Sequence, residues 1–171
     1  GRISHFYLIS GPEGSGKHTL ARLLAAAAVC REERKPCLCC GPCRKVMADT
    51  HPDITQVVDP EHKNLPVRIV REIRDDMFIR PNEADKKIYM FAQSMRTESQ
   101  NALLKILEEP PSYVVFILAT TEMHKLPATI VSPQLWIVIS CFPSILHRGW
   151  NLPRRMIWAL TLTPHSSRIP W

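Results

Sequence analysis

The feature that most constrains the fold is a glycine-rich segment between a short apolar run and a longer run rich in leucine and alanine. Residues 11–17 have the sequence GPEGSGK, the apolar run His5–Ser10 precedes them, and Thr19–Val29 follows. Glycines let successive backbone N–H groups turn toward phosphate oxygens, and the first turn of a helix adds its positive dipole end. The pattern G-x-x-x-x-G-K between a strand and a helix predicts a phosphate-binding P-loop in an α/β domain.

The P-loop departs from its usual pattern at one position. Lys17 is expected to reach the terminal phosphates of a nucleotide, but the next residue is His18 instead of the Ser or Thr whose hydroxyl holds Mg²⁺. Phosphate binding remains the prediction, with weak ATP binding and a compromised Mg²⁺ site. A glycine-rich turn with an incidental lysine is the alternative. The predicted nucleotide contacts in this segment are Gly11, Gly14, Ser15, Gly16, Lys17, His18 and Thr19.

The rest of the first 132 residues alternates between strand and helix patterns. Near-continuous apolar strands separated by helices predict a parallel sheet that is covered on both faces. Thr97 and Gln100 form a capping-box pattern at the start of one helix, and Pro66 suits the first turn of another. The expected strands are His5–Ser10, Ile54–Val58, Ile88–Ala92 and Tyr113–Ala119, and the expected helices are Thr19–Val29, Val67–Met77 and Thr97–Leu107.

Five of the six cysteines fall within residues 30–43. Cys37, Cys40 and Cys43 are spaced C-x-x-C-x-x-C, and Cys30 lies upstream, so four thiolates are available for a structural zinc ion. Cys39 lies off this spacing. Nearby prolines and glycine favour tight turns here. A disulfide cluster and a redox C-x-x-C pair are the alternatives, but four thiolates that fill the coordination sphere predict a structural Zn²⁺ in an insertion over residues 30–43.

Together, five segments resemble one family. They are the P-loop, the four-cysteine insertion, THPD at residues 50–53, NALLKILEEPP at residues 101–111, and LATT at residues 118–121. In this order they resemble the AAA+ subunits of the bacterial clamp loader, within the DNA polymerase III holoenzyme. The resemblance covers about residues 3–132 and implies a P-loop NTPase (AAA+) module with a parallel sheet flanked by helices.

Within that family, the resemblance favours the delta-prime type over the gamma/tau motor subunit. The motor subunit carries an Asp-Glu pair at the end of its third strand, where this chain has Ala92 and Gln93, and no carboxylate follows until Glu98. With His18 as well, the chain is expected not to hydrolyse ATP. Thr120 or Thr121 matches the position that senses the γ-phosphate in active relatives. Without the Asp-Glu pair, however, we favour a threonine at the end of a strand whose hydroxyl bonds nearby backbone groups.

Residues 133–171 differ in composition from the first 132. All sixteen acidic residues and 18 of the 22 basic residues precede Pro133, whereas all four tryptophans follow it. Pro133 stands where the family has an arginine, and the resemblance stops there. We expect an atypical tail that is frameshifted or disordered, with the lid and collar domains absent; a divergent tail or a membrane-surface segment is the alternative. Only Leu135–Ile139 is expected to add a strand.

The resemblance implies a cytoplasmic replication protein that supports ATP-driven loading of the sliding clamp. Its expected partners are the gamma/tau and delta subunits, and, through the assembled complex, the clamp and primed DNA; no membrane is expected. A gamma/tau-type ATPase fragment and an unrelated P-loop kinase are the alternatives. A zinc-dependent DNA-binding module is disfavoured because the first 132 residues are nearly neutral.

Overall fold

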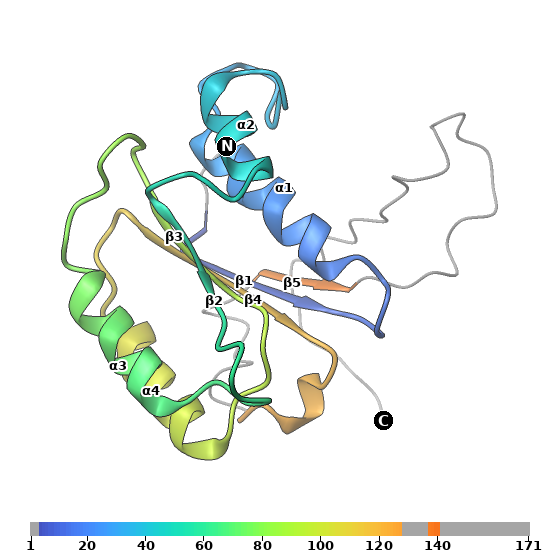
Figure 1. The fold of residues 1–171 in the computed structure, drawn as a ribbon, viewed down its shortest axis with the longest axis vertical. Helices are drawn as coiled ribbons and strands as arrows, with labels where there is room; N and C mark the ends of the chain where they lie inside the picture. Colours follow the sequence, from blue (N-terminus) through green and yellow to red (C-terminus); the bar gives the residue numbers. More distant parts are fainter. Residues whose placement is uncertain (1–3, 128–136, 141–171) are drawn as a thin grey trace, which may run out of the picture.

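The computed structural model describes residues 4–127 and 137–140, which form a parallel β-sheet with helices on both faces (Figure 1). All pairings between neighbouring strands are parallel, and the strand order is β2-β3-β4-β1-β5. The strands are β1 (Phe6–Ser10), β2 (Ile54–Val57), β3 (Lys87–Phe91), β4 (Val114–Thr120) and β5 (Ile137–Ser140). The predicted parallel α/β sheet is therefore confirmed.

Two pairs of helices cover the two faces of the sheet. One face carries α1 (Lys17–Val29) and α2 (Gly41–Met47), and the other carries α3 (Val67–Asp76) and α4 (Thr97–Glu108), as Figure 1 shows. A short 3₁₀ helix, η1 (Met123–Lys125), follows β4. The alternation of strands and helices along the chain produces this three-layer arrangement, because each crossover returns the chain to the start of a parallel strand.

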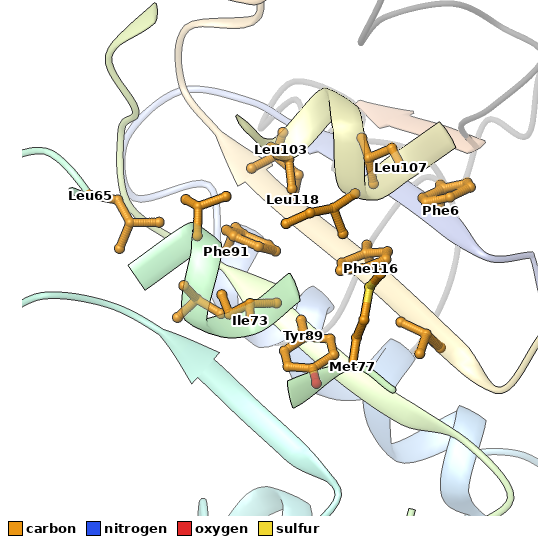
Figure 2. Close-up of a cluster of buried hydrophobic side chains, with 14 of the residues drawn as sticks. Phe6, Leu65, Ile73, Met77, Tyr89, Phe91, Leu103, Leu107, Phe116 and Leu118 are labelled. Carbon is orange, nitrogen blue, oxygen red and sulfur yellow. The ribbon is translucent and has the colours of Figure 1, made fainter. Parts of the chain in front are cut away.

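The larger apolar core lies between the sheet and the α3–α4 layer. Phe116 at the centre of β4 stacks against Phe6 of β1 and Tyr89 of β3, with ring centroids 5.8 and 5.6 Å apart (Figure 2). Ile73 of α3 and Leu107 of α4 pack onto the same side. A second apolar cluster fills the opposite side, beneath α1 and α2. Every residue of β3 is buried, as expected for a strand with helices on both faces.

Three local predictions were wrong. Tight turns were expected throughout the cysteine segment, but α2 begins at Gly41, since a proline in the first turn of a helix costs no hydrogen bond. The capping box at Thr97 is not formed: Arg96 is the N-cap, and the Gln100 side chain instead donates to the Met95 carbonyl. Pro66 is the N-cap of α3 and precedes its first turn.

The sheet continues into the segment that the sequence assigns to the tail. Within Leu135–Ile139, the structure describes only residues from Ile137 onward, and these belong to β5, which pairs with β1 from Tyr7↔Ile137 to Ser10↔Ser140. Residues 128–136 and 141–171 lie outside the described part of the chain, so the expectations for most of the tail and for the domain boundary at Ser132 remain predictions.

Candidate functional site

A hollow opens at the carboxyl ends of three neighbouring strands, where parallel sheets usually bind ligands. It has a volume of about 500 Å³ and is lined from the segments that follow β1, β3 and β4. The P-loop supplies Glu13, Gly14, Gly16, Lys17 and His18; the other lining residues are Ala92, Ser94, Ala119, Thr120 and Thr121. The volume lies within the range of small-ligand sites.

The P-loop backbone has the conformation that its glycines permit. Gly14 and Gly16 have φ values of 74° and 78°, in the left-handed region where other residues are strained. A Cβ at Gly14 would meet no atom within 4 Å, so glycine is required here by the positive φ and not by crowding. Helix α1 begins at Lys17, which directs its first N–H groups to the hollow. The loop thus has the shape of an anion cradle.

Lys17 lies beside this cradle with its ammonium group turned back onto the loop. Its side chain is buried, and Nζ donates a hydrogen bond of 2.6 Å to the carbonyl of Pro12. The hydroxyl of Ser15 is also buried and has no hydrogen-bond partner among the described residues. A phosphate group in the hollow would offer an acceptor to Lys17, which lines it, whereas Ser15 is not among the lining residues. Of the other predicted contacts, Gly11 donates its N–H to the Thr120 carbonyl, and Thr19 faces an adjoining hollow instead.

Among the described residues, neither the P-loop hydroxyl nor the strand-end carboxylate that hold Mg²⁺ in active P-loop enzymes lines this hollow. His18 lines it at the hydroxyl position, and Ala92 and Ser94 line it after β3. The Gln93 side chain is engaged elsewhere: its Oε1 accepts the Asp59 N–H at 2.7 Å, and its Nε2 donates to the Asp59 carbonyl at 3.1 Å. In the part of the chain that the structure describes, Glu13 is the one carboxylate that lines the hollow. These residues do not fit a Mg²⁺ ion held by a hydroxyl and a strand-end carboxylate.

Thr120 lies at the end of β4 on the wall of the hollow, as predicted, but its hydroxyl has a local partner. Oγ1 accepts the backbone N–H of Glu122 at 3.0 Å. This bond is the local backbone role that the sequence analysis favours for the threonine. Thr121 lines the hollow as well, so both threonines lie within reach of a ligand there.

The cysteine segment brings four sulfur atoms together beside α1, on the face of the sheet that α1 and α2 cover. The sulfurs of Cys30, Cys37, Cys40 and Cys43 all lie within 4.8 Å of one another. Zinc–sulfur bonds of about 2.3 Å in a tetrahedron place the sulfurs about 3.8 Å apart, so a small contraction would fit the four thiolates to one ion. Cys39 is exposed and is not part of this group.

The protein shifts the acidity of two of these thiols in opposite directions. The backbone N–H groups of Cys40 and Cys39 lower the pKa of the Cys37 thiol to about 6, and the Cys40 N–H lies 3.3 Å from the Cys37 sulfur. Burial raises the pKa of Cys43 to about 12, and its thiol donates to the Ala26 carbonyl at 3.7 Å. A metal that binds here must therefore displace a proton from Cys43.

The THPD segment (residues 50–53) contributed to the family resemblance, and its last residue has a structural role. Asp53 is buried, and its carboxylate accepts the backbone N–H groups of Asn82, Glu83 and Ala84 at 2.5, 2.7 and 2.8 Å. Burial alone raises the pKa of this carboxyl, but the three donors outweigh burial, and the net pKa is lowered. Asp53 thereby ties the start of β2 to the loop that leads into β3. No local pattern in the sequence links these two segments.

Comparison with known proteins places the chain in a family. The model of a family described as DNA polymerase III, delta subunit, matches residues 1–141. The tau subunit of Bacillus subtilis DNA polymerase III is 39% identical over 136 residues, which are 77% of this chain and 24% of that protein. The tau subunit of Escherichia coli is 38% identical over 136 residues, with 77% and 21% covered. The gamma subunit of Buchnera aphidicola from Acyrthosiphon pisum is 37% identical over 140 residues, with 80% and 38% covered.

A solved structure has a similar fold. It is the gamma subunit-related protein of Thermotoga maritima, with a TM-score of 0.61 and 23% identity, and the match covers 88% of this chain and 42% of that one. The chain thus spans well under half the length of the relatives it matches. Within the described residues, no helix is long and apolar enough to cross a bilayer. On the family match and the identities to gamma and tau subunits, the chain belongs to the DNA polymerase III clamp-loader family as a gamma/tau-like relative.

Proposed function

We propose that the chain acts as a delta-prime-type subunit of the clamp loader, which supports loading of the sliding clamp without hydrolysing ATP itself. The observation that carries this proposal is the side-chain composition of the hollow at the P-loop. His18, Ala92 and Ser94 line it where metal-holding groups belong, and Gln93 is bonded to the Asp59 backbone. With an imidazole in place of the P-loop hydroxyl and no carboxylate at the end of β3 to place Mg²⁺, a catalyst of phosphoryl transfer lacks its main electrostatic support.

In this proposal the P-loop retains a weak nucleotide site. The glycine-rich loop, the N-terminus of α1 and the ammonium of Lys17, which lines the hollow, favour a bound phosphate. To bind it, Lys17 exchanges its bond with the Pro12 carbonyl for one with a phosphate oxygen, so part of the gain is offset. A nucleotide bound in this way would stabilise the fold of the subunit and would not be hydrolysed.

We further propose that Cys30, Cys37, Cys40 and Cys43 hold a structural Zn²⁺. The proximity of the four sulfurs supports this, as does the lowered pKa of Cys37, which favours the thiolate that zinc requires. Four protein ligands leave no open position on the ion, so it would serve to fold the segment between α1 and α2. The chain would act in the cytoplasm beside the gamma/tau and delta subunits, and reach the clamp and primed DNA through them.

The experiment is reconstitution with separately purified gamma/tau motor and delta subunits from the same source. The full chain is expected to co-elute with both on a sizing column and to allow ATP-dependent loading of the clamp onto primed DNA. A Lys17→Ala variant should assemble equally well, because the motor subunits supply the hydrolysis. Failure of the wild-type chain to enter the complex would contradict the proposed role.

A second candidate, a gamma/tau-type ATPase, is favoured by the identities of 37 to 39% to proteins named as gamma and tau subunits. The two candidates differ in whether the P-loop of this chain supports turnover.

A further inference from the structure

We propose that His18 adapts the P-loop hollow to polyphosphate without Mg²⁺, so that the site prefers the metal-free form of a nucleoside diphosphate. The inference rests on the proposed nucleotide site and adds the form of ligand that the site selects. His18 is the second residue of α1, lies directly after Lys17, and lines both the P-loop hollow and the adjoining one. His18 therefore borders the space that a phosphate chain would occupy.

The length of the His18 side chain is the first observation that supports this proposal. In active P-loops, a Ser or Thr hydroxyl at this position holds Mg²⁺, which in turn contacts phosphate oxygens. A hydroxyl oxygen followed by a Mg–O bond of about 2.1 Å extends about 4.5 Å from the Cα atom, and the Nε2 atom of a histidine lies at about the same distance. The imidazole therefore reaches about as far as the hydroxyl and the ion together, and a ring N–H can donate directly to a phosphate oxygen.

The second step is the ligand chemistry of the ion. Mg²⁺ requires hard oxygen ligands in an octahedron, and imidazole is a ligand that suits zinc, copper and nickel instead. Among the described residues after β3, Ser94 brings a hydroxyl to the hollow, but the Ala92 side chain has no donor atom, Gln93 is bonded to the Asp59 backbone, and no carboxylate from this segment lines the hollow. A Mg²⁺–nucleotide complex would bring its ion and bound waters against His18, and among the described residues no carboxylate after β3 lines the hollow to hold them.

The third step is charge. Lys17 and the first turn of α1 supply positive potential to the hollow, and Glu13 is the one acidic residue on its wall among the described residues. In a metal-free diphosphate the oxygens that Mg²⁺ would cover are available to hydrogen-bond donors. Lys17, the P-loop N–H groups and His18 are such donors. Mg²⁺ in solution would compete with them for the same oxygens and weaken binding.

The test is titration of the full chain with ADP in metal-depleted buffer and in buffer with millimolar MgCl₂, by calorimetry and without a chelator, which would also attack the cysteine site. The wild-type protein is expected to bind ADP more tightly without Mg²⁺. In His18→Ser, affinity without Mg²⁺ should fall about tenfold, the effect of one lost hydrogen bond to a charged group, and added Mg²⁺ should no longer weaken binding. His124→Ser, which removes an imidazole outside the hollow, is the matched control and should behave as wild type.

The outcomes separate this inference from the proposed nucleotide site. If Mg²⁺ tightens ADP binding by the wild-type chain, or His18→Ser binds as well as wild type without Mg²⁺, the inference is overturned while the P-loop site stands. If the folded wild-type chain binds no ADP in either buffer, both are overturned. Lys17→Ala should abolish binding in both buffers, and far-UV circular dichroism should show that each variant is folded.

Discussion

Replacing Asp53 by asparagine tests the anchor between β2 and the loop before β3, because the change removes a charge while preserving shape. The native carboxylate accepts three backbone N–H groups, one on Oδ1 and two on Oδ2. An amide that keeps its oxygen toward Glu83 and Ala84 points its NH₂ group at the Asn82 N–H, so one buried donor loses its acceptor.

The expected cost follows from these three bonds. A lost hydrogen bond to a charged group costs about 1.5 to 3 kcal/mol, and the two bonds that remain become neutral and weaker, so Asp53→Asn should lower the free energy of unfolding by about 2 to 4 kcal/mol. With a typical urea dependence of about 2 kcal/mol per M, the unfolding midpoint should fall by about 1 to 2 M. That is a large share of the stability of an ordinary domain.

The assay is urea unfolding followed by far-UV circular dichroism, with Asp85→Asn as the matched control. Asp85 lies in the same loop and is exposed, so its replacement makes the same change in charge and should shift the midpoint little. Because the pKa of folded Asp53 is lowered, its stabilisation is complete above the unfolded pKa of about 3.9 and is lost as the pH falls through the folded value. The difference between wild type and Asp53→Asn should therefore shrink below about pH 4. Equal midpoints for Asp53→Asn and Asp85→Asn at pH 7 would refute the reasoning.

Two further predictions concern the cysteine segment and the core. Protein purified under reducing conditions should hold one Zn²⁺, which Cys37→Ser or Cys43→Ser releases and Cys39→Ser retains; atomic absorption measures this, and zinc loss in Cys39→Ser would show that the ligand set is wrong. Tyr89→Phe removes the hydroxyl that donates to the Asp76 carboxylate at 2.7 Å and should lower the free energy of unfolding by about 1 kcal/mol in the same urea assay. An unchanged midpoint would mean that this buried bond contributes nothing.

The sequence predicted the sheet well because each strand carries its own signal. The four strands expected before residue 132 all appear within about one residue of their predicted bounds, since continuous apolar runs such as Tyr113–Ala119 have few other ways to be buried. The P-loop was predictable for a different reason. Its backbone depends on positive φ values at Gly14 and Gly16, and glycine in a fixed spacing is visible in the sequence.

The features that the sequence did not predict depend on contacts between distant segments. Nothing near Asp53 indicates that its carboxylate binds a loop some thirty residues later, and nothing near Gln93 indicates its bonds to Asp59. The capping-box prediction at Thr97 was wrong because local spacing cannot show that the Gln100 amide finds the Met95 carbonyl instead. Helix α2 was missed because glycine and proline, which often end helices, here occupy its first turn.

The central claim is that this P-loop does not support ATP turnover, and the most direct measurement is the rate of ATP hydrolysis by the purified chain in the presence of Mg²⁺, with and without primed DNA. We expect a rate that is indistinguishable from that of Lys17→Ala under the same conditions, because His18, Ala92 and Gln93 provide no group that places the metal or the attacking water. Hydrolysis by the wild-type chain that disappears in Lys17→Ala would show instead that the chain is a gamma/tau-type ATPase.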